Sequence, residues 1–306
     1  MLRAAPLVIV LSFMLCRLGF SPASAVEPAK KNPAPTSKFV RLNRDAAGKP
    51  LTLDTAIVRY VGTRPDQAGL VVDLVGAVHV GERSYYEQLN KRFAEYDVVL
   101  YELVAPPGTR ITKDAKGGNH PVRMIQNGMK DFLLLEHQLE HIDYLKPNLM
   151  HADMSPDDFA RSMHDRGESL LGMYFRLMGE AMARQSSAKS GASDLQLLLA
   201  LLDENRAVAI KQLLAEQFED LEGAMRALGG PQGSTIVTER NNVALAKLKE
   251  QIAAGSKRIA IFYGAAHFPD MEQKLLGQFN LKRTTQHWLP AWNLQSELKK
   301  SQRHPS

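Results

Sequence analysis

Cysteine is almost absent from this chain of 306 residues, because Cys16 is its only one. Cys16 lies in the first 25 residues, which have the features of a secretory signal: basic Arg3, the apolar run "APLVIVLSFML", too short to span a bilayer, and a small-residue cleavage site ending at Ala25. Cleavage would leave no disulfide and no cysteine nucleophile. The sequence therefore predicts a secreted or periplasmic protein that depends on its hydrophobic core for stability.

Other signatures are also missing. The chain has no G-x-S-x-G serine elbow and no G-x-x-x-x-G-K-[ST] phosphate loop. Its formal net charge is +5, but its basic residues are scattered among acids and form no stripe with interleaved aromatics. These absences argue against a serine hydrolase, a P-loop protein and a nucleic-acid partner. We expect a peptide or small-molecule substrate.

Composition and hydrophobic periodicity divide the chain into four parts. We expect a signal peptide, a flexible Pro/Lys-rich tether, one domain and a short tail, at residues 1–25, 26–36, 37–300 and 301–306. No transmembrane segment is expected in the mature chain. Within the domain, residues from about 155 to 228 have an almost continuous helical pattern, which predicts a helical insertion.

A strand–helix–strand unit predicts the fold class. Residues 69–76 and 97–104 have the apolar runs of buried strands, and residues 84–96 form an amphipathic helix with a capping box of Ser84 and Glu87. Such a unit places its strands parallel. We expect an α/β fold with a mostly parallel central sheet, flanking helices and the helical insertion near the carboxyl ends of the strands. A buried strand is also expected at 258–264, and residues 121–141 are expected to be helical.

Four predicted strands are followed by side chains that bind metals. The carboxyl ends of parallel strands share one edge, where ligands bind. Imidazole and carboxylate groups there suit a divalent transition metal, so Zn, Mn, Co and Fe all fit. The residues in question are His79, Glu102, Asp153 and His267.

Two glycines and a charged pair belong to the same hypothesis. Gly76 and Gly264 precede the two histidines, and we expect them to let the chain turn sharply off each strand. Glu239 and Arg240 lie in the helix before the last buried strand. Spacing alone favours a solvated charge pair there, whereas a functional arginine would orient a carbonyl or carboxylate of the substrate.

These elements together resemble the TraB/GumN family, which includes the pheromone-shutdown proteins and the Tiki-type metalloproteases. The resemblance runs from about Leu70 to Trp292 and rests on "GAVH", "DVVLYE", "ERNN" and "GAAHFP" in that order. The chain departs from the family pattern at Ala77, where Thr is usual, and at residues 268–270, where Leu-Pro-Gly is usual. The resemblance implies metal-dependent hydrolysis, with functional positions at His79, Glu102, Arg240 and His267.

A second metal motif competes with this one. The stretch "HQLEH" fits H-x-x-E-H, in which His137 and His141 would lie one helical turn apart and bind zinc while Glu140 acts as base. The same stretch also fits an amphipathic helix with Leu135 and Leu139 facing inward. A zinc protease built on this motif is therefore an alternative function.

The leading hypothesis is an exported metal-dependent hydrolase that cleaves a peptide or ester bond. The ion would be bound by His79, Glu102 and His267, with Asp153 as a further ligand. Glu102 or Glu239 would act as general base, and Arg240 would orient the substrate or stabilise the oxyanion. The alternative from another class is a non-catalytic exported protein that binds a peptide, a metal or haem through the same edge.

Overall fold

The structure is a computed structural model that describes residues 39–106, 108–109, 135–169, 172–173, 203, 205–219 and 233–295. The expected signal, tether and tail lie outside these residues, and so does much of the expected insertion. Among the helices that are described, none is long and apolar enough to cross a membrane.

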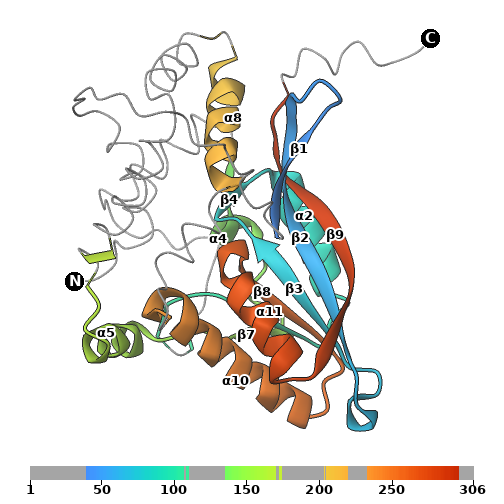
Figure 1. Cartoon of the computed structure of the whole chain (residues 1–306), viewed down its shortest axis with the longest axis vertical. Helices are drawn as coiled ribbons and strands as arrows, with labels where there is room; N and C mark the ends of the chain where they lie inside the picture. The colour runs from blue at the N-terminus through green and yellow to red at the C-terminus, as the bar shows by residue number, and fades with distance from the viewer. Residues whose placement is uncertain are drawn as a thin grey trace, which may run out of the picture.

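A mixed sheet of seven strands forms the centre of the described structure (Figure 1). Four neighbouring strands run parallel, in the order β3 (Val71–Ala77), β8 (Arg258–Gly264), β5 (Val98–Tyr101) and β7 (Leu149–His151). Three more strands add antiparallel pairs beside β3: β2 (Pro50–Gly62), β1 (Val40–Arg44) and β9 (Leu281–Asn293). The expected α/β fold with parallel strands at its centre is confirmed.

The parallel strands have the composition of fully covered strands. From Ile259 to Tyr263, every residue of β8 is completely buried, and Val72, Leu74, Val99 and Leu100 are buried equally well on its two neighbours. Strands covered on both faces form continuous apolar runs rather than alternating ones. The two runs that flank α2 and the run before His267 were recognisable for that reason.

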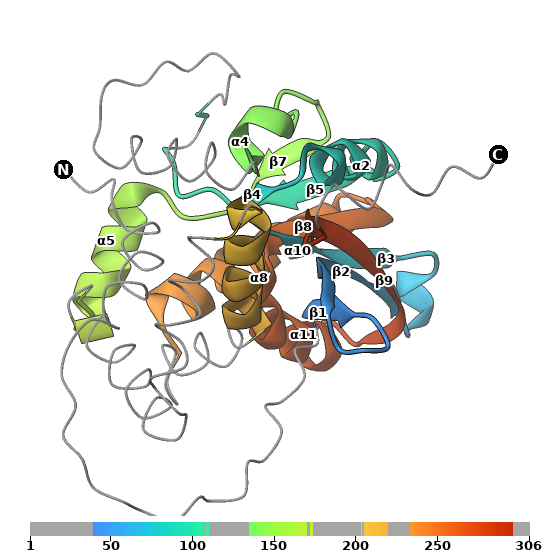
Figure 2. The same cartoon turned by 90° about the horizontal axis from the view of Figure 1, so that it is seen from above.

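Helices cover both faces of this sheet. α2 (Arg83–Phe93) and α4 (Gln138–His141) lie on one face, and α10 (Arg240–Ala253) and α11 (Phe268–Gly277) lie on the other (Figures 1 and 2). Two helices fall within the expected insertion, α5 (Pro156–Asp165) and α8 (Arg206–Glu219), and α8 contacts β1.

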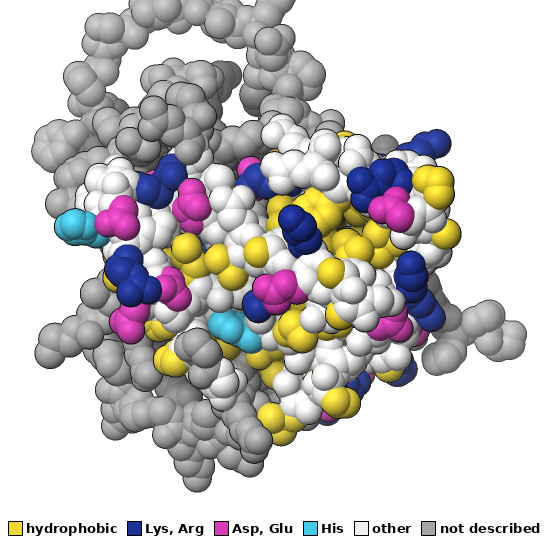
Figure 3. Space-filling view, turned by 90° about the horizontal axis from the view of Figure 1, so that it is seen from below, with side chains coloured by type: hydrophobic (Ala, Val, Ile, Leu, Met, Phe, Trp, Pro, Cys, Tyr) yellow, Lys and Arg dark blue, Asp and Glu magenta, His cyan; other side chains and the backbone are white. Residues whose placement is uncertain are grey.

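Short elements complete the described chain. They are the 3₁₀ turns η1 (Pro65–Gln67) and η3 (Ala265–His267), the π-helical turn η2 (Thr235–Glu239), and a two-stranded sheet of β4 (Val80–Gly81) and β6 (Glu136–His137). On the face drawn in Figure 3, positive and negative side chains are interspersed, with hydrophobic side chains exposed between them.

The strand–helix–strand unit is present as β3, α2 and β5, but its two strands are not neighbours. β8 lies between them and pairs in parallel with both, Val71 opposite Arg258 on one side and Val98 opposite Ile259 on the other. The expected capping box is wrong, because the N-cap of α2 is Glu82 and no side chain caps the helix.

The expected helix over residues 121–141 is also corrected. Residues 121–134 lie outside the described part, and the remainder begins with the strand β6 before the four-residue helix α4. β6 pairs with β4, so the backbone of Glu136 and His137 is part of a two-stranded sheet rather than of a helix. Leu135 is buried as expected, but Leu139 is 46% exposed.

Candidate active site

Side chains from three of the parallel strands and from α10 meet at the carboxyl-terminal edge of the sheet. Glu102 directly follows β5, Asp153 lies just beyond β7, and His267 ends the turn η3 after β8. Arg240 is the first residue of α10 and reaches this edge from the covering helix. The structure therefore brings together Glu102, Asp153, Arg240 and His267, which are far apart in the sequence.

Glu102 is bound through both of its oxygens. Oε2 accepts a hydrogen bond from the backbone N–H of Gly264 (2.6 Å), and Oε1 accepts one from Arg240 Nη2 (2.6 Å). Burial opposes the negative charge of Glu102, but the positive charge of Arg240, followed by the fields of His267 and His79, outweighs burial and holds the pKa of Glu102 well below its usual range. The carboxylate is therefore ionised at neutral pH.

Arg240 joins this carboxylate to a second one. Its Nε and Nη2 donate to the two oxygens of Asp153 (2.9 and 2.6 Å), while Nη2 also reaches Glu102. The Arg240 side chain is only 12% exposed and that of Asp153 is 0% exposed. The interpretation of Arg240 as part of a solvated charge pair is therefore wrong: it forms a bidentate, buried ion pair of the kind for which arginine is suited.

His267 points its second ring nitrogen at Glu102. Nε2 lies 3.5 Å from Glu102 Oε1, and Nδ1 lies 2.7 Å from Asn241 Oδ1. The Asn241 amide nitrogen donates to the His267 carbonyl and to Asp270, so its Oδ1 is the acceptor and His267 Nδ1 carries the proton. Burial lowers the pKa of His267 to about 4 against the opposing field of Glu102, so the ring is neutral at pH 7 with a free lone pair on Nε2.

Asn241 is the member of this cluster that the sequence analysis did not identify. It is fully buried in the first turn of α10, next to Arg240. The only sequence signal was its place in "ERNN", where a second polar residue follows the arginine. Neither helical periodicity nor spacing identifies which of the two asparagines faces the sheet.

His79 is placed at the same edge but on the solvent side. His79 follows β3 and is exposed to solvent. Its backbone carbonyl accepts a hydrogen bond from the backbone N–H of Gln138 (3.0 Å). Its charge influences the pKa values of both Glu102 and His267, which places it in their electrostatic surroundings.

Glu239 lies beside this cluster, and its side chain pairs with Arg166 (3.0 Å). Both residues line a cavity of about 480 Å³ between α5 and the start of α10. Asp153, which binds Arg240, lines the same cavity, together with the charged residues Asp158, Arg161 and Asp165. A polar space therefore borders the cluster on its Asp153 side.

The two glycines have roles other than the expected sharp turn. Neither Gly76 nor Gly264 has a positive φ. Gly76 lies inside β3, where a Cβ atom would be 3.0 Å from the carbonyl oxygen of Ala56 on β2. A Cβ atom on Gly264 would be 3.3 Å from Oε2 of Glu102, so this glycine makes room for the carboxylate that its N–H binds.

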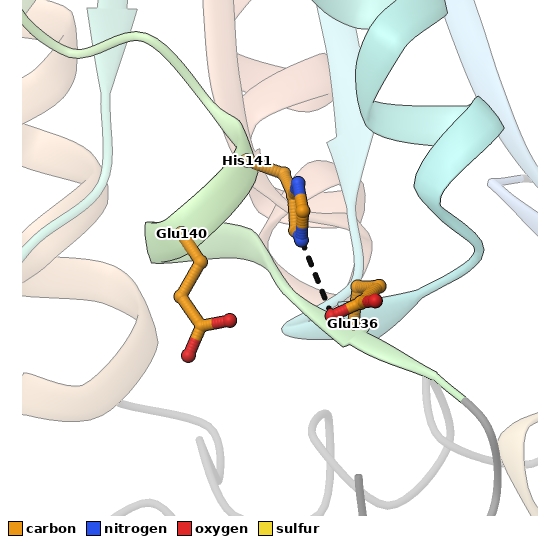
Figure 4. Close-up of side chains that lie close together, drawn as sticks. All are labelled: Glu136, Glu140 and His141. Carbon is orange, nitrogen blue, oxygen red and sulfur yellow. Dashed lines mark ion pairs between the residues drawn. The ribbon is translucent and has the colours of Figure 1, made fainter. Parts of the chain in front are cut away.

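A separate group of side chains satisfies a geometric criterion for a metal site. Glu136, Glu140 and His141 each present a ligand atom, and these atoms lie within 4.8 Å of one another, a group that could hold a metal ion (Figure 4). It is the one such group of three or more His, Cys, Asp or Glu residues in the described part of the chain, so His79, Glu102, Asp153 and His267 are less tightly gathered.

This group differs from the zinc motif expected from "HQLEH". His137 lies in β6 and precedes α4, so it does not share a helix with His141, and it is not a member of the group. Glu136 takes the place expected for His137, with its Oε2 3.2 Å from Nε2 of His141.

No protein-family model, no curated protein and no solved structure matches this chain.

Proposed function

We propose that this protein is an exported metal-dependent hydrolase of the TraB/GumN type, with its reaction centre at Glu102 and His267. The observation that carries the proposal is the pair of donor atoms at the carboxyl-terminal edge of the sheet: Nε2 of His267 lies 3.5 Å from Oε1 of Glu102. One is a neutral imidazole and the other an ionised carboxylate, which are the charge states that bind a divalent transition metal.

The surroundings of His267 support its role as a ligand. Metal-binding histidines usually donate their other ring N–H to a protein acceptor, which sets the tautomer and the ring orientation. Asn241 is such an acceptor for Nδ1 and is itself held by two further hydrogen bonds. Nε2 is left as the coordinating atom.

The two carboxylates differ in their fitness as ligands. Each oxygen of Glu102 accepts one hydrogen bond, which leaves it one lone pair for an ion. Oδ1 of Asp153 accepts two hydrogen bonds, from Arg240 Nε and from the N–H of Met154, and Oδ2 accepts one from Arg240 Nη2, so Asp153 keeps one lone pair where Glu102 keeps two. We therefore assign Asp153 to the positioning of Arg240, and His79 with Glu102 and His267 to the metal.

The chemistry of the proposed centre divides among few groups. A bound ion would polarise a peptide or ester carbonyl and acidify a water molecule. Arg240, held by two carboxylates, presents a fixed positive charge beside Glu102 and would orient a carbonyl or carboxylate of the substrate. The polar cavity beside Asp153 and Glu239 is the space in which we place the substrate, and Glu239 is the second carboxylate that could act as general base.

The test is metal-dependent turnover. The purified protein, freed of metal with EDTA, is supplied with Zn²⁺, Mn²⁺, Co²⁺ or Fe²⁺ in turn and screened against peptide and ester libraries. We expect turnover with at least one ion, and its loss in the isosteric variant Glu102→Gln and in His267→Gln. The matched control Glu250→Gln changes an exposed glutamate on α10 and should retain full activity.

Two outcomes contradict the proposal. Turnover that persists in both Glu102→Gln and His267→Gln would place the reaction elsewhere. Tight binding of a peptide, a metal or haem without turnover, lost in the same variants, would instead support the non-catalytic binding protein.

A further inference from the structure

We propose that Glu136, Glu140 and His141 form a second divalent-metal site, which ties the segment 135–141 together beside the reaction centre. Two carboxylate oxygens and one imidazole nitrogen lie within 4.8 Å of one another here. That donor set suits Zn²⁺, Mn²⁺, Co²⁺ or Fe²⁺ and leaves further coordination positions for water.

The ligands come from a short stretch whose two ends are fixed by other elements. At one end, β6 pairs with β4, with Glu136 opposite Gly81. At the other end, the His141 carbonyl accepts a hydrogen bond from the Asn90 side chain of α2 (2.7 Å), and Asn90 also accepts the N–H of Asp143 (3.0 Å). The backbone that carries the ligands is thus positioned before an ion binds, which lowers the entropic cost of binding.

The orientation of the His141 ring is also determined. It lies nearly parallel to the ring of Tyr86, with an angle of 9° between the planes and 6.1 Å between the centres. In Figure 4 the ring points its Nε2 at Glu136, 3.2 Å away, and the carboxylate of Glu140 extends from the same short helix. Glu140 is exposed, whereas the other two are partly buried, so an ion can enter from solvent on the Glu140 side.

The same segment contains polar atoms that the described structure leaves unsatisfied. Nε2 of His137 and Oε1 of Gln138 are buried and have no hydrogen-bond partner in the described part of the chain. Gln138 is only 5% exposed, so water at the surface does not satisfy its oxygen. Such atoms are uncommon in folded proteins, and a bound ion or water is one explanation for them. This observation is independent of the spacing of the three ligands and points to the same segment.

A metal at this site would act on the reaction centre through His79, an inference that rests on the proposed function. The N–H of Gln138 donates to the carbonyl of His79, and β4, which pairs with β6, begins at the next residue, Val80. Fixing the 135–141 segment therefore fixes the backbone from which His79 projects.

The experiment measures metal stoichiometry and affinity with the metal alone. Metal-free full-length protein is titrated with Co²⁺ and Zn²⁺ by visible absorption and calorimetry, in wild type and in Glu140→Gln, His141→Ala and His267→Gln. We expect Glu140→Gln and His141→Ala each to weaken one equivalent by at least about tenfold, because even substitutions outside the ligand shell cost 10–100-fold. The same equivalent should bind normally in His267→Gln.

A matched control and a second readout complete the test. Glu250→Gln neutralises another exposed glutamate, on α10, and this variant should bind metal as wild type does. Added Zn²⁺ should slow amide hydrogen exchange over residues 136–142 in wild type but not in Glu140→Gln. A Glu140→Gln variant that binds as many ions as wild type, and whose exchange over residues 136–142 Zn²⁺ slows as much as in wild type, would overturn this site. Failure of the proposed function is recognised separately, by turnover that survives His267→Gln.

Discussion

Arg240 is the residue on which the charge balance of the edge cluster depends. Its guanidinium is the shared partner of Asp153 and Glu102, whose side chains are 0% and 11% exposed. Removing one member of a buried ion network leaves its partners charged and desolvated, which costs far more than the intact network contributes.

We therefore expect Arg240→Gln to lower the free energy of unfolding by about 3 to 5 kcal/mol, measured by urea unfolding without metal. The matched control is Arg258→Gln, since Arg258 is 52% exposed and lies 3.6 Å from an exposed Glu95. That surface pair should contribute less than about 1 kcal/mol. Equal, small effects of both substitutions would contradict the buried network.

His267 supplies a pH dependence of known sign. Burial lowers its pKa to about 4, below the ordinary 6.5 that it regains on unfolding. Between these two pH values the unfolded chain binds more protons than the folded protein. The contribution of His267 to the free energy of unfolding is therefore full above about pH 6.5 and is lost as the pH drops toward 4. The carboxyl of Glu102, whose pKa is also lowered, adds its own loss only at more acidic pH.

The measurement compares wild type with His267→Gln in EDTA, so that bound metal does not contribute. Between pH 7 and pH 4.5, wild type should lose about 2 kcal/mol more of its free energy of unfolding than the variant does. Parallel pH profiles of the two proteins would contradict a neutral, buried His267.

Residue types and strand ends were sufficient to predict part of the candidate site. Glu102 and His267 were identifiable because each follows a continuous apolar run that ends in a polar side chain. The partners of Arg240 and the contacts of Asn241 could not be predicted, because they depend on which face α10 turns toward the sheet. Polar residues at consecutive positions of a helix do not show which of them faces the sheet.

At the scale of elements, β2 and β3 approach each other closely at Gly76. A Cβ atom there would lie 3.0 Å from the backbone oxygen of Ala56 and 3.2 Å from the Cβ of Thr55. Both atoms belong to β2, which is paired on its two edges and has little freedom to move.

We expect Gly76→Ala to destabilise the protein by about 1 to 3 kcal/mol through overpacking, measured by urea unfolding. Gly277→Ala is the control: Gly277 is the last residue of α11, and among the described atoms none lies within 4 Å of its Cβ position. This change should be neutral or stabilise by up to about 1 kcal/mol. If Gly76→Ala leaves the free energy of unfolding unchanged, the backbone of β2 can shift to accommodate the added methyl group.

The order of the elements was harder to predict than their existence. Buried strands were recognisable from apolar runs, and α5 from the cap at Ser155, whose side chain accepts the N–H of Asp158. The placement of β8 between β3 and β5 could not be predicted. It pairs segments more than a hundred residues apart, and no local sequence feature determines which strands become neighbours.

At the scale of the whole molecule, one hydrophobic cluster runs through the described structure from Phe39 to Leu294. It includes Trp292 on β9, Leu248 on α10 and Phe262 on β8, so the antiparallel and parallel parts of the sheet share a core. β3 joins them, because it pairs with β2 on one side and with β8 on the other. Neither part can lose its strands without exposing apolar surface of the other.

Urea unfolding should therefore be a single transition for both parts of the sheet. The only tryptophans, Trp288 and Trp292, both lie in β9 and report on the antiparallel side, whereas far-UV circular dichroism is dominated by helices such as α10 and α11. We expect the same midpoint from tryptophan fluorescence and from circular dichroism, and an equal shift of both in Gly76→Ala. A fluorescence transition that finishes at lower urea than the loss of helix would show that β9 and its neighbours unfold on their own, and the shared core would then not couple the two sides.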